Sequence, residues 1–489
     1  MDNCGCSPSG PVEKESRPEG ILRLQAGDTV SDDKSGRTAA LYGCISCIIG
    51  KDYAGQDGVK RVLPVMLFLA LCFPPWLHAE EYTFDISEIE KKPYHIGGYA
   101  ELMPVFFGLD KDASQYKLRF YNRNEGATLE EYNAALQLEG SLEKGITRLF
   151  VRTNTDYKKS YLGEDQETTI YEGFLSLKPS SSLTVSMGKK TLKWGKGYAW
   201  NPVAFVDRPK NPDDLELSLE GYIVAAADYI KSLEGPLKTV SLTPVIIPVY
   251  EDINDTFGEI DKVNLAGKLY LLIYDTDIDV MFLSGGSKTA RYGVDFSSNI
   301  TTNFEIHGEF AVIEDYKKRF IDSAGNLFEK EFDAESYLAG VRYLTERETT
   351  YILEYYRNGE GFTTDEMRDY FSFINTAYDS YFSSGSDVLL KKGLNITEGN
   401  YGRINPAIEY VYLRISQKEP FDILYFTPSI TGISNIADRS FSLSPELLYT
   451  GITNLDLRLK AGFIAGENLS EYGERPNDYR VEFRMRYYF

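Results

Sequence analysis

Asp478 to Phe489 reads D-Y-R-V-E-F-R-M-R-Y-Y-F, and apolar or aromatic residues occupy every second position up to the end of the chain. The positions between them carry Arg, Glu, Arg, Arg and Tyr. Because a β-strand has a period of two residues, the two sets of side chains lie on opposite faces of one strand. The stretch therefore predicts a strand with an apolar face and a charged face. An edge strand of a soluble sandwich alternates in the same way, so the pattern alone leaves two fold classes open.

The last residues of this strand resemble the C-terminal signal of Gram-negative outer-membrane β-barrels, which also end on an aromatic residue. Tyr487 and Phe489 stand at the positions of that signal. The resemblance implies that the strand closes a transmembrane barrel and that the barrel assembly machinery is a partner of the chain. We therefore expect an outer-membrane protein whose outer face contacts lipid.

The composition limits the classes of protein to which the chain can belong. Its 489 residues have a net charge of -21, 26% of them are charged, and the mean hydropathy is -0.31. A bundle of membrane-spanning helices needs runs of about 20 apolar residues and is excluded, whereas barrel strands are apolar on one face only. Nucleic acid is not an expected partner, because binding phosphates requires clustered Lys and Arg.

The one strongly apolar run predicts a secretory signal peptide over residues 59–79. Lys60 and Arg61 precede the apolar stretch Val62–Leu77, and small Ala79 follows it. A short basic head, an apolar core and a small residue at the cleavage site are typical of such peptides, and this core is too short to span a membrane as a helix. Cleavage near Ala79 would leave a chain destined for the outer membrane.

Residues 1–58 lie ahead of this signal, although a signal peptide is recognised at the start of a nascent chain. We predict that they are a mis-assigned extension, either disordered or never translated. The true start would then be at Val59, read from an alternative initiation codon, directly before the basic head of the signal.

All five cysteines of the chain lie at or before Cys72. The pairs Cys4-x-Cys6 and Cys44-x-x-Cys47 match no strong zinc-binding spacing. Lipidation of Cys72 is not expected either, because bulky Leu71 stands where a lipoprotein motif has a small residue. We therefore expect no metal, no cofactor and no disulfide in the exported chain.

After an N-terminal periplasmic segment over residues 80–93, we expect one barrel over residues 94–489. Tyr132–Leu142 and Asn454–Phe463 alternate as the closing strand does. Counted back from the C-terminus, the linkers follow the short and long rhythm that is typical of transmembrane barrels. The predicted periplasmic turns are Glu143–Gly145, Pro179–Ser182, Thr345–Glu348, Lys418–Pro420 and Gly451–Thr453. The predicted long exterior loops are Gly195–Leu217, Tyr250–Asp261, Asp315–Ala334, Asn358–Pro406 and Ala465–Asn477.

The expected fold is therefore all-β, a single antiparallel transmembrane barrel of about 18 strands, with 16 as the alternative. The uncertain region is Asp110–Thr128, where Gln115–Tyr121 reads either as a strand or as part of an exterior loop. A closed barrel of this size leaves an aqueous channel.

The least generic stretch of the sequence runs from Gly188 to Gly221. Its Trp194-Gly195-x-Gly197 followed by Asn201-Pro202 resembles a segment of porin-like outer-membrane families, including phosphate-selective and alginate-export-like porins. The resemblance implies the porin-like class and names no solute. The stretch continues as a loop that prolines stiffen, and we expect it to fold inward as a constriction. The alternative is a surface loop. The charged residues of the predicted constriction are Asp207, Arg208, Lys210, Asp213 and Asp214.

The polar faces of the predicted strands define the pore wall. One hypothesis is a basic lane for small anionic solutes. The alternative is that these Arg residues pair across strands with Glu139, Asp456 and Glu482 and select nothing. The predicted pore-lining residues are Arg148, Arg152, Arg342, Arg414, Arg458, Lys460, Arg480, Glu482, Arg484 and Arg486.

An enzymatic role is not expected. Glu305, His307 and Glu309 share one inward face, a pattern that can bind a metal or carry acid–base chemistry. However, alternate residues on a strand lie about 7 Å apart, and a lumen wall is polar in any case. We predict no catalytic residues.

The expected function is passive diffusion of small hydrophilic solutes through a porin-like channel. Two further classes stay open. The barrel could sheathe another protein, such as an electron carrier, or it could be a surface receptor or adhesin that binds through the loop Asn358–Pro406. The sequence also leaves open whether the barrel forms homo-oligomers.

Overall fold

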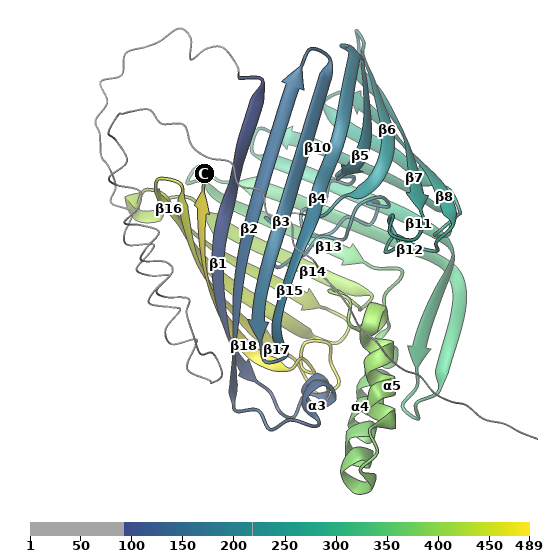
Figure 1. Ribbon diagram of the computed structural model, residues 1–489, viewed down its shortest axis with the longest axis vertical. Helices are drawn as coiled ribbons and strands as arrows, with labels where there is room; N and C mark the ends of the chain where they lie inside the picture. Colours follow the sequence, from purple (N-terminus) through teal and green to yellow (C-terminus); the bar gives the residue numbers. More distant parts are fainter. Residues whose placement is uncertain (1–91, 218) are drawn as a thin grey trace, which may run out of the picture. The chain divides into compact units, whose positions relative to one another are not determined.

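The computed structural model describes residues 92–217 and 219–489, which fold into one closed antiparallel sheet of 18 strands (Figure 1). Consecutive strands pair with each other, and β1 (Tyr94–Leu109) also pairs with β18 (Asn477–Tyr488), which closes the barrel. The predicted all-β barrel of 18 strands is confirmed, and the alternative of 16 is wrong. The predicted extension and signal peptide, with most of the segment 80–93, lie outside the described residues.

The remaining strands follow in chain order. They are β2 (Thr128–Lys144), β3 (Thr147–Ser160), β4 (Gly163–Ser180), β5 (Leu183–Lys190), β6 (Tyr222–Ser232), β7 (Leu237–Val249), β8 (Lys262–Ile273), β9 (Thr276–Leu283), β10 (Arg291–Thr301), β11 (Phe304–Ile321), β12 (Leu327–Leu344), β13 (Thr349–Arg357), β14 (Glu409–Gln417), β15 (Phe426–Asn435), β16 (Ser440–Ile452) and β17 (Leu455–Ala465).

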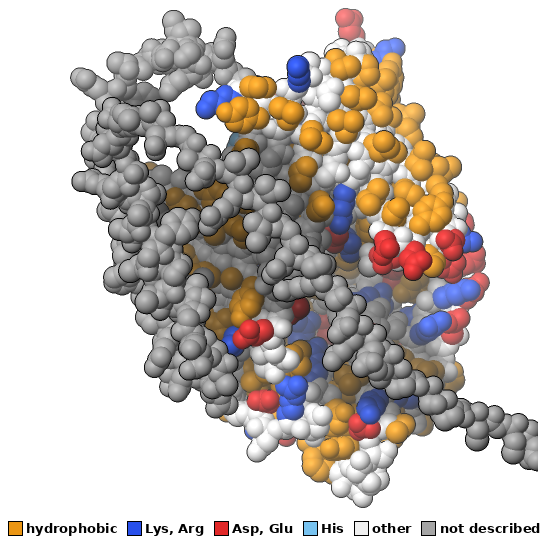
Figure 2. Space-filling view, in the orientation of Figure 1, with side chains coloured by type: hydrophobic (Ala, Val, Ile, Leu, Met, Phe, Trp, Pro, Cys, Tyr) orange, Lys and Arg blue, Asp and Glu red, His pale blue; other side chains and the backbone are white. Residues whose placement is uncertain are grey.

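Side chains alternate between the two faces of these strands as the sequence predicts. On β17 and β18, Arg458 and Arg484 are buried, whereas Leu459 and Phe483 are 44% and 43% exposed. On these two strands polar side chains therefore point into the barrel and apolar ones outward, the reverse of a soluble protein. Figure 2 shows hydrophobic side chains gathered on the upper part of the visible outer wall.

The two ends of the barrel differ in their connections. Both Tyr94 and Phe489 lie at one end, here called the terminal end, where the Gly98 N–H donates to the Phe489 carbonyl. The opposite end, here called the loop end, carries the helices (Figure 1). The connections at the terminal end are 145–146, 181–182, 233–236, 274–275, 302–303, 345–348, 418–425 and 453–454. Those at the loop end are 110–127, 161–162, 191–221, 250–261, 284–290, 322–326, 358–408, 436–439 and 466–476.

The structure decides one open alternative and corrects one prediction. Gln115–Tyr121 is not a strand but belongs to the loop-end connection 110–127, in line with the other alternative, and it lies largely in helix α3 (Ser114–Phe120), where Tyr116 stacks on Phe120 at a centroid distance of 4.8 Å. Asp315–Ala334 is not a loop, because β11 and β12 continue to the short turn 322–326. A shift of register between Ile313 and Tyr316 breaks the alternation there and hides the strands in the sequence.

The loop 358–408 contains α4 (Thr364–Ser384), α5 (Val388–Ile396) and a π-helical turn, η2 (Thr397–Tyr401). Thr363 and Glu366 form a capping box at the start of α4. These helices share an apolar core with α3 and the end of β11. The segment η3 (Pro420–Asp422) lies in the connection 418–425 and is a turn with positive φ at Phe421 and Asp422. No helix within residues 92–217 and 219–489 combines the length and apolar character needed to cross a membrane.

Candidate functional site

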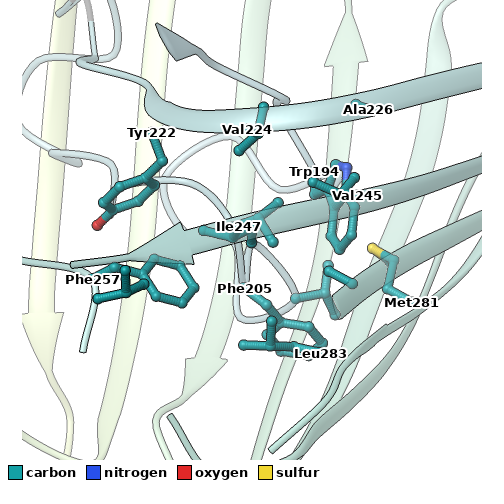
Figure 3. Packing of buried hydrophobic residues seen from close by; sticks show 14 of the residues in the cluster. Trp194, Phe205, Tyr222, Val224, Ala226, Val245, Ile247, Phe257, Met281 and Leu283 are labelled. Carbon is teal, nitrogen blue, oxygen red and sulfur yellow. The ribbon is translucent and has the colours of Figure 1, made fainter. Parts of the chain in front are cut away.

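The loop 191–221, here called the inner loop, packs against the inner face of the barrel wall. Its Trp194 and Phe205 are buried in an apolar cluster with inward side chains of β6, β7 and β9 (Figure 3). The wall residues labelled in this cluster are Tyr222, Val224, Ala226, Val245, Ile247, Met281 and Leu283. An apolar inner face would be costly in a water-filled channel, and the inner loop covers it. This patch was not predicted from the sequence, although V-I-I-P-V at residues 245–249 indicates a strand that is apolar on both faces.

The first half of the inner loop offers a series of backbone N–H groups to three carboxylates. Asp207, within the loop itself, accepts from Leu192, Lys193 and Trp194 at 2.8, 3.0 and 2.9 Å. Burial raises the pKa of the Asp207 carboxyl, and these three hydrogen bonds oppose the rise. Asp207 was predicted to face solutes, but its carboxylate is turned back onto its own loop.

Glu309 on β11 is the second of these carboxylates. It accepts hydrogen bonds from the backbone of Lys196, Gly197 and Val203 at 2.6, 2.7 and 3.3 Å, and from the Asn201 amide at 2.8 Å. The side chain is 4% exposed, so all four bonds are shielded from water. Glu309 therefore fixes the inner loop to the wall at β11.

Glu354 on β13 is the third carboxylate. It accepts from the backbone of Tyr198 and Ala199 at 2.5 and 3.0 Å. Next to it on the loop, Trp200 stacks on Tyr356 of the same strand at a centroid distance of 5.2 Å. The Trp-Gly-x-Gly…Asn-Pro segment is thus a backbone turn that is bound by acidic side chains of the wall.

The two glycines of this segment are required by the close approach of these groups. Gly195 has a φ of 92°, and a Cβ there would lie 2.8 Å from Glu309 Oε1. A Cβ at Gly197 would lie 2.1 Å from the Trp200 carbonyl oxygen. Any larger residue would push the loop away from its anchoring carboxylates.

The second half of the inner loop reaches the basic side chains of β17 and β18. Asp214 contacts Arg458 at 3.0 Å and Arg484 at 2.6 Å. Asp213 contacts Arg480 at 3.3 Å, and its carbonyl oxygen accepts from Lys460. Burial raises the pKa of Asp214, but hydrogen bonds and charge from the two guanidiniums outweigh it and hold the pKa below its usual range.

The other two charged residues of the predicted constriction contact the loop itself. Lys210 donates to the Gly197 carbonyl at 2.7 Å, and burial lowers the pKa of its ammonium group. Arg208 contacts Glu220 at 2.8 Å. Of the five predicted residues, only Asp213 and Asp214 therefore reach the far wall.

The predicted pore-lining arginines all have acidic partners within 4.0 Å. Glu482 contacts Arg458 at 3.0 Å, as one of the two hypotheses expects. Glu139 instead contacts His95, and Asp456 accepts from the Tyr488 hydroxyl. The other wall pairs are Arg148–Glu143, Arg152–Glu172, Arg342–Glu305, Arg414–Glu446, Arg484–Glu101 and Arg486–Glu101.

The three inward residues of β11, Glu305, His307 and Glu309, contact different partners. His307 is buried, with its Nε2 3.0 Å from Glu354 and its Nδ1 3.6 Å from Glu305. Glu309 is occupied by the inner loop. In the part of the chain that the structure describes, no three His, Cys, Asp or Glu side chains converge in a way that could hold a metal ion.

A cavity of about 860 Å³ lies against the inner loop. Its lining includes Asn211 and Asp214 of the inner loop, Arg152 of β3, and Arg403 and Asn405 of the loop 358–408. It therefore connects the inner loop with segments of the loop end. Basic side chains outnumber acidic ones in its lining, in contrast to the whole chain.

No known protein-family profile matches the chain, and no curated protein sequence matches it. Solved structures of bacterial porins are distantly similar. Pseudomonas aeruginosa OccK5 (OpdH) is 13% identical with a TM-score of 0.48, and the match covers 81% of this chain and 98% of that chain. A BenF-like porin from Pseudomonas fluorescens Pf-5 is 10% identical with a TM-score of 0.47 and the same coverage, and Pseudomonas aeruginosa OpdQ is 11% identical at 0.46, again with the same coverage. At this distance the description of the fold rests on the strand pairing given above.

Proposed function

We propose that the chain is an outer-membrane, porin-like channel for passive diffusion of small hydrophilic solutes, in which the inner loop forms the constriction. The observation that carries the proposal is the pair of attachments of this loop. Its first half is bound to Glu309 and Glu354, and its second half is bound to Arg458 and Arg484. A loop tied to the wall at β11, β13, β17 and β18 narrows the path through the barrel and sets which solutes pass.

Anionic solutes are the finer part of the proposal. The basic row on β17 and β18 is neutralised by acids of the wall and by Asp213 and Asp214. A paired guanidinium attracts an anion much less than a free one. We therefore propose that the preference for anions is modest, and that it depends on these two aspartates.

The outer surface supports the location in the outer membrane. Tyr487 and Phe489, the residues of the predicted assembly signal, are 50% and 54% exposed. They continue the outward apolar face of β18. We propose that this face contacts lipid and that the assembly machinery recognises its end.

The test is ion conductance of the purified barrel in planar bilayers, compared with a variant that lacks Lys210–Leu215. The proposal expects discrete openings for the natural chain and a larger single-channel conductance for the deletion. A matched deletion of Phe382–Ser386, at the exposed end of α4, controls for shortening a loop-end segment. Equal single-channel conductance of the natural chain and the Lys210–Leu215 deletion would refute the proposal that the inner loop forms the constriction.

A surface receptor or adhesin is the second candidate, and the folded module of α3, α4 and α5 favours it. Phe382 and Val388 at its tip are each 67% exposed. A sheath around another protein is less well supported, because the inner loop occupies space inside the barrel. If the purified barrel binds cells or protein through this tip and conducts no ions, the receptor or adhesin replaces the channel as the proposed function.

A further inference from the structure

Three cationic side chains from separate segments line one side of the cavity. They are Arg208 of the inner loop, Lys288 of the connection 284–290 and Arg291 at the start of β10. None of them belongs to the wall of β17 and β18. Their convergence needs an explanation, because bringing like charges together in a partly buried place is unfavourable.

Two aromatic rings hold two of these cations in place. The Lys288 ammonium lies 3.9 Å from the centroid of Phe257, and the Arg208 guanidinium lies 4.9 Å from that of Tyr222. The two rings meet edge to face at 5.0 Å, at the rim of the apolar cluster (Figure 3). This aromatic pair stabilises both cations from one side through cation–π contacts and leaves their other sides to the cavity.

The three cations have fewer acidic partners than cations. Arg208 contacts Glu220 at 2.8 Å, but Glu220 is shared with Lys189. Arg291 has only a 3.6 Å contact with Glu360. The Nε atoms of both arginines are buried without a hydrogen-bond partner among the described residues.

Lys288 has the fewest polar partners of the three cations. Within residues 92–217 and 219–489, its ammonium contacts the Phe257 ring and has no hydrogen bond or ion pair. Burial, followed by repulsion from Arg291, lowers the pKa of Lys288 to about 7, and Glu360 only partly opposes this. A partly buried cation without a hydrogen-bond partner carries a desolvation cost, and a bound anion would reduce that cost.

We propose that Arg208, Lys288 and Arg291 form a binding site for an oxyanion, the carboxylate, sulfate or phosphate group of a small solute. The three side chains supply charge-assisted donors from one side of the cavity, and the Tyr222–Phe257 pair sets their positions. The site goes beyond the proposed channel, because an anion can bind there whether or not the barrel conducts.

The test is calorimetric titration of the purified full barrel in detergent at pH 8, with sulfate and with succinate as separate probes. The natural chain is expected to bind at least one of them saturably. Lys288→Met removes the charge while retaining an unbranched side chain over Phe257. Because one charge-assisted donor is lost, affinity is expected to fall roughly tenfold or more. Arg291→Gln is expected to weaken binding in the same direction.

The matched control is Lys193→Met, which removes one positive charge from an exposed lysine of the same cavity. It is expected to change affinity by less than about threefold, because an exposed charge acts through a screened field. Circular dichroism checks that each variant has the barrel fold. Binding of sulfate alone indicates a tetrahedral group, binding of succinate alone a carboxylate, and binding of both a site for either.

Proton uptake gives a readout that a purely structural role of Lys288 would not move. At pH 8 the free amine is mostly neutral, and a bound anion raises its pKa, so binding takes up protons in the natural chain and not in Lys288→Met. Three results would overturn the proposal: no saturable binding of either probe, undiminished binding in Lys288→Met, or an equal loss in Lys193→Met.

Discussion

Replacing Glu309 by Gln tests how the inner loop is held. The substitution keeps the size of the side chain but leaves one oxygen to accept the four hydrogen bonds from Lys196, Gly197, Asn201 and Val203. Three of these bonds converge on Oε1, so the Gln oxygen can still accept them, but each is weaker by about 1 kcal/mol because the acceptor is uncharged. The bond from Val203 to Oε2 is lost, which brings the total loss of attachment energy to about 4 kcal/mol. The 18-stranded ladder does not depend on Glu309, so the barrel is expected to remain folded.

Amide hydrogen exchange measures this attachment directly. A loss of about 4 kcal/mol in local stability corresponds to roughly a thousandfold faster exchange of the loop amides. Peptides that cover residues 195–203 should show the change, and peptides of β17 should not. Glu314→Gln, an exposed Glu to Gln change on the same strand, is the matched control. Unchanged protection of residues 195–203 in folded Glu309→Gln would refute the anchoring role.

Four further predictions concern the same region and its neighbours. Gly197→Ala should release the inner loop as Glu309→Gln does, because the new Cβ would lie 2.1 Å from the Trp200 carbonyl oxygen. Amide hydrogen exchange of residues 195–203 measures this release. Unchanged protection of these residues would contradict the prediction. Asp214→Asn should shift the reversal potential in a salt gradient toward anion preference, because it removes the negative charge that pairs with Arg458 and Arg484. No shift, or a shift toward cation preference, would contradict the proposed control of ion selectivity by Asp214. In the natural chain the lowered pKa of Asp214 keeps this contact charged as the pH falls from about 7 to 5, so the loop should stay attached over that range. Burial raises the pKa of Glu471 to about 7, so the folded connection 466–476 binds more protons than the unfolded chain and loses stability as the pH rises from about 5 to 8. The protection factors of residues 466–476, that is, their exchange rates corrected for the intrinsic rise with pH, should therefore fall over this range in the natural chain and not in Glu471→Gln. Constant protection factors in the natural chain would refute this prediction.

The barrel itself was predictable because its determinants are local. In β18 the alternation of Arg480, Glu482 and Arg484 with apolar residues sets which face is inward, and this is visible in a few consecutive residues. The same rule fails near Asp315, which has a φ of 48° and lies where the register of β11 shifts. One irregular residue was enough to turn a long hairpin into a predicted loop.

The attachments of the inner loop were not predictable, because they are determined by the folded barrel. Glu354 lies 155 residues from Ala199, and Arg458 lies 244 residues from Asp214. Nothing in the spacing of either pair indicates the contact. The available signal was chemical: two glycines beside a tryptophan, and acidic residues at inward positions of β11 and β13 that needed donors.

The basic row of β17 and β18 was visible in the sequence, but its net charge was not predictable, because it too depends on contacts of the folded barrel. Arg458, Arg480 and Arg484 lie on the inward face as alternation predicts. Their charge state as a group depends on Asp213 and Asp214, which come from a loop that is remote in sequence. A basic lane for anions and a wall of paired charges show the same alternation of residues along these strands, so the sequence does not distinguish them.

The central claim, that the inner loop lies in the path of ions, can be tested with a single cysteine. Residues 80–489 contain no cysteine, so Asn211→Cys in the cavity lining would be the only thiol of a chain that begins at Glu80. Ser384→Cys, at the exposed end of α4, is the control. The account predicts that a bulky thiol reagent lowers the single-channel current of Asn211→Cys and leaves that of Ser384→Cys unchanged. Complete labelling of Asn211→Cys with an unchanged current would contradict it.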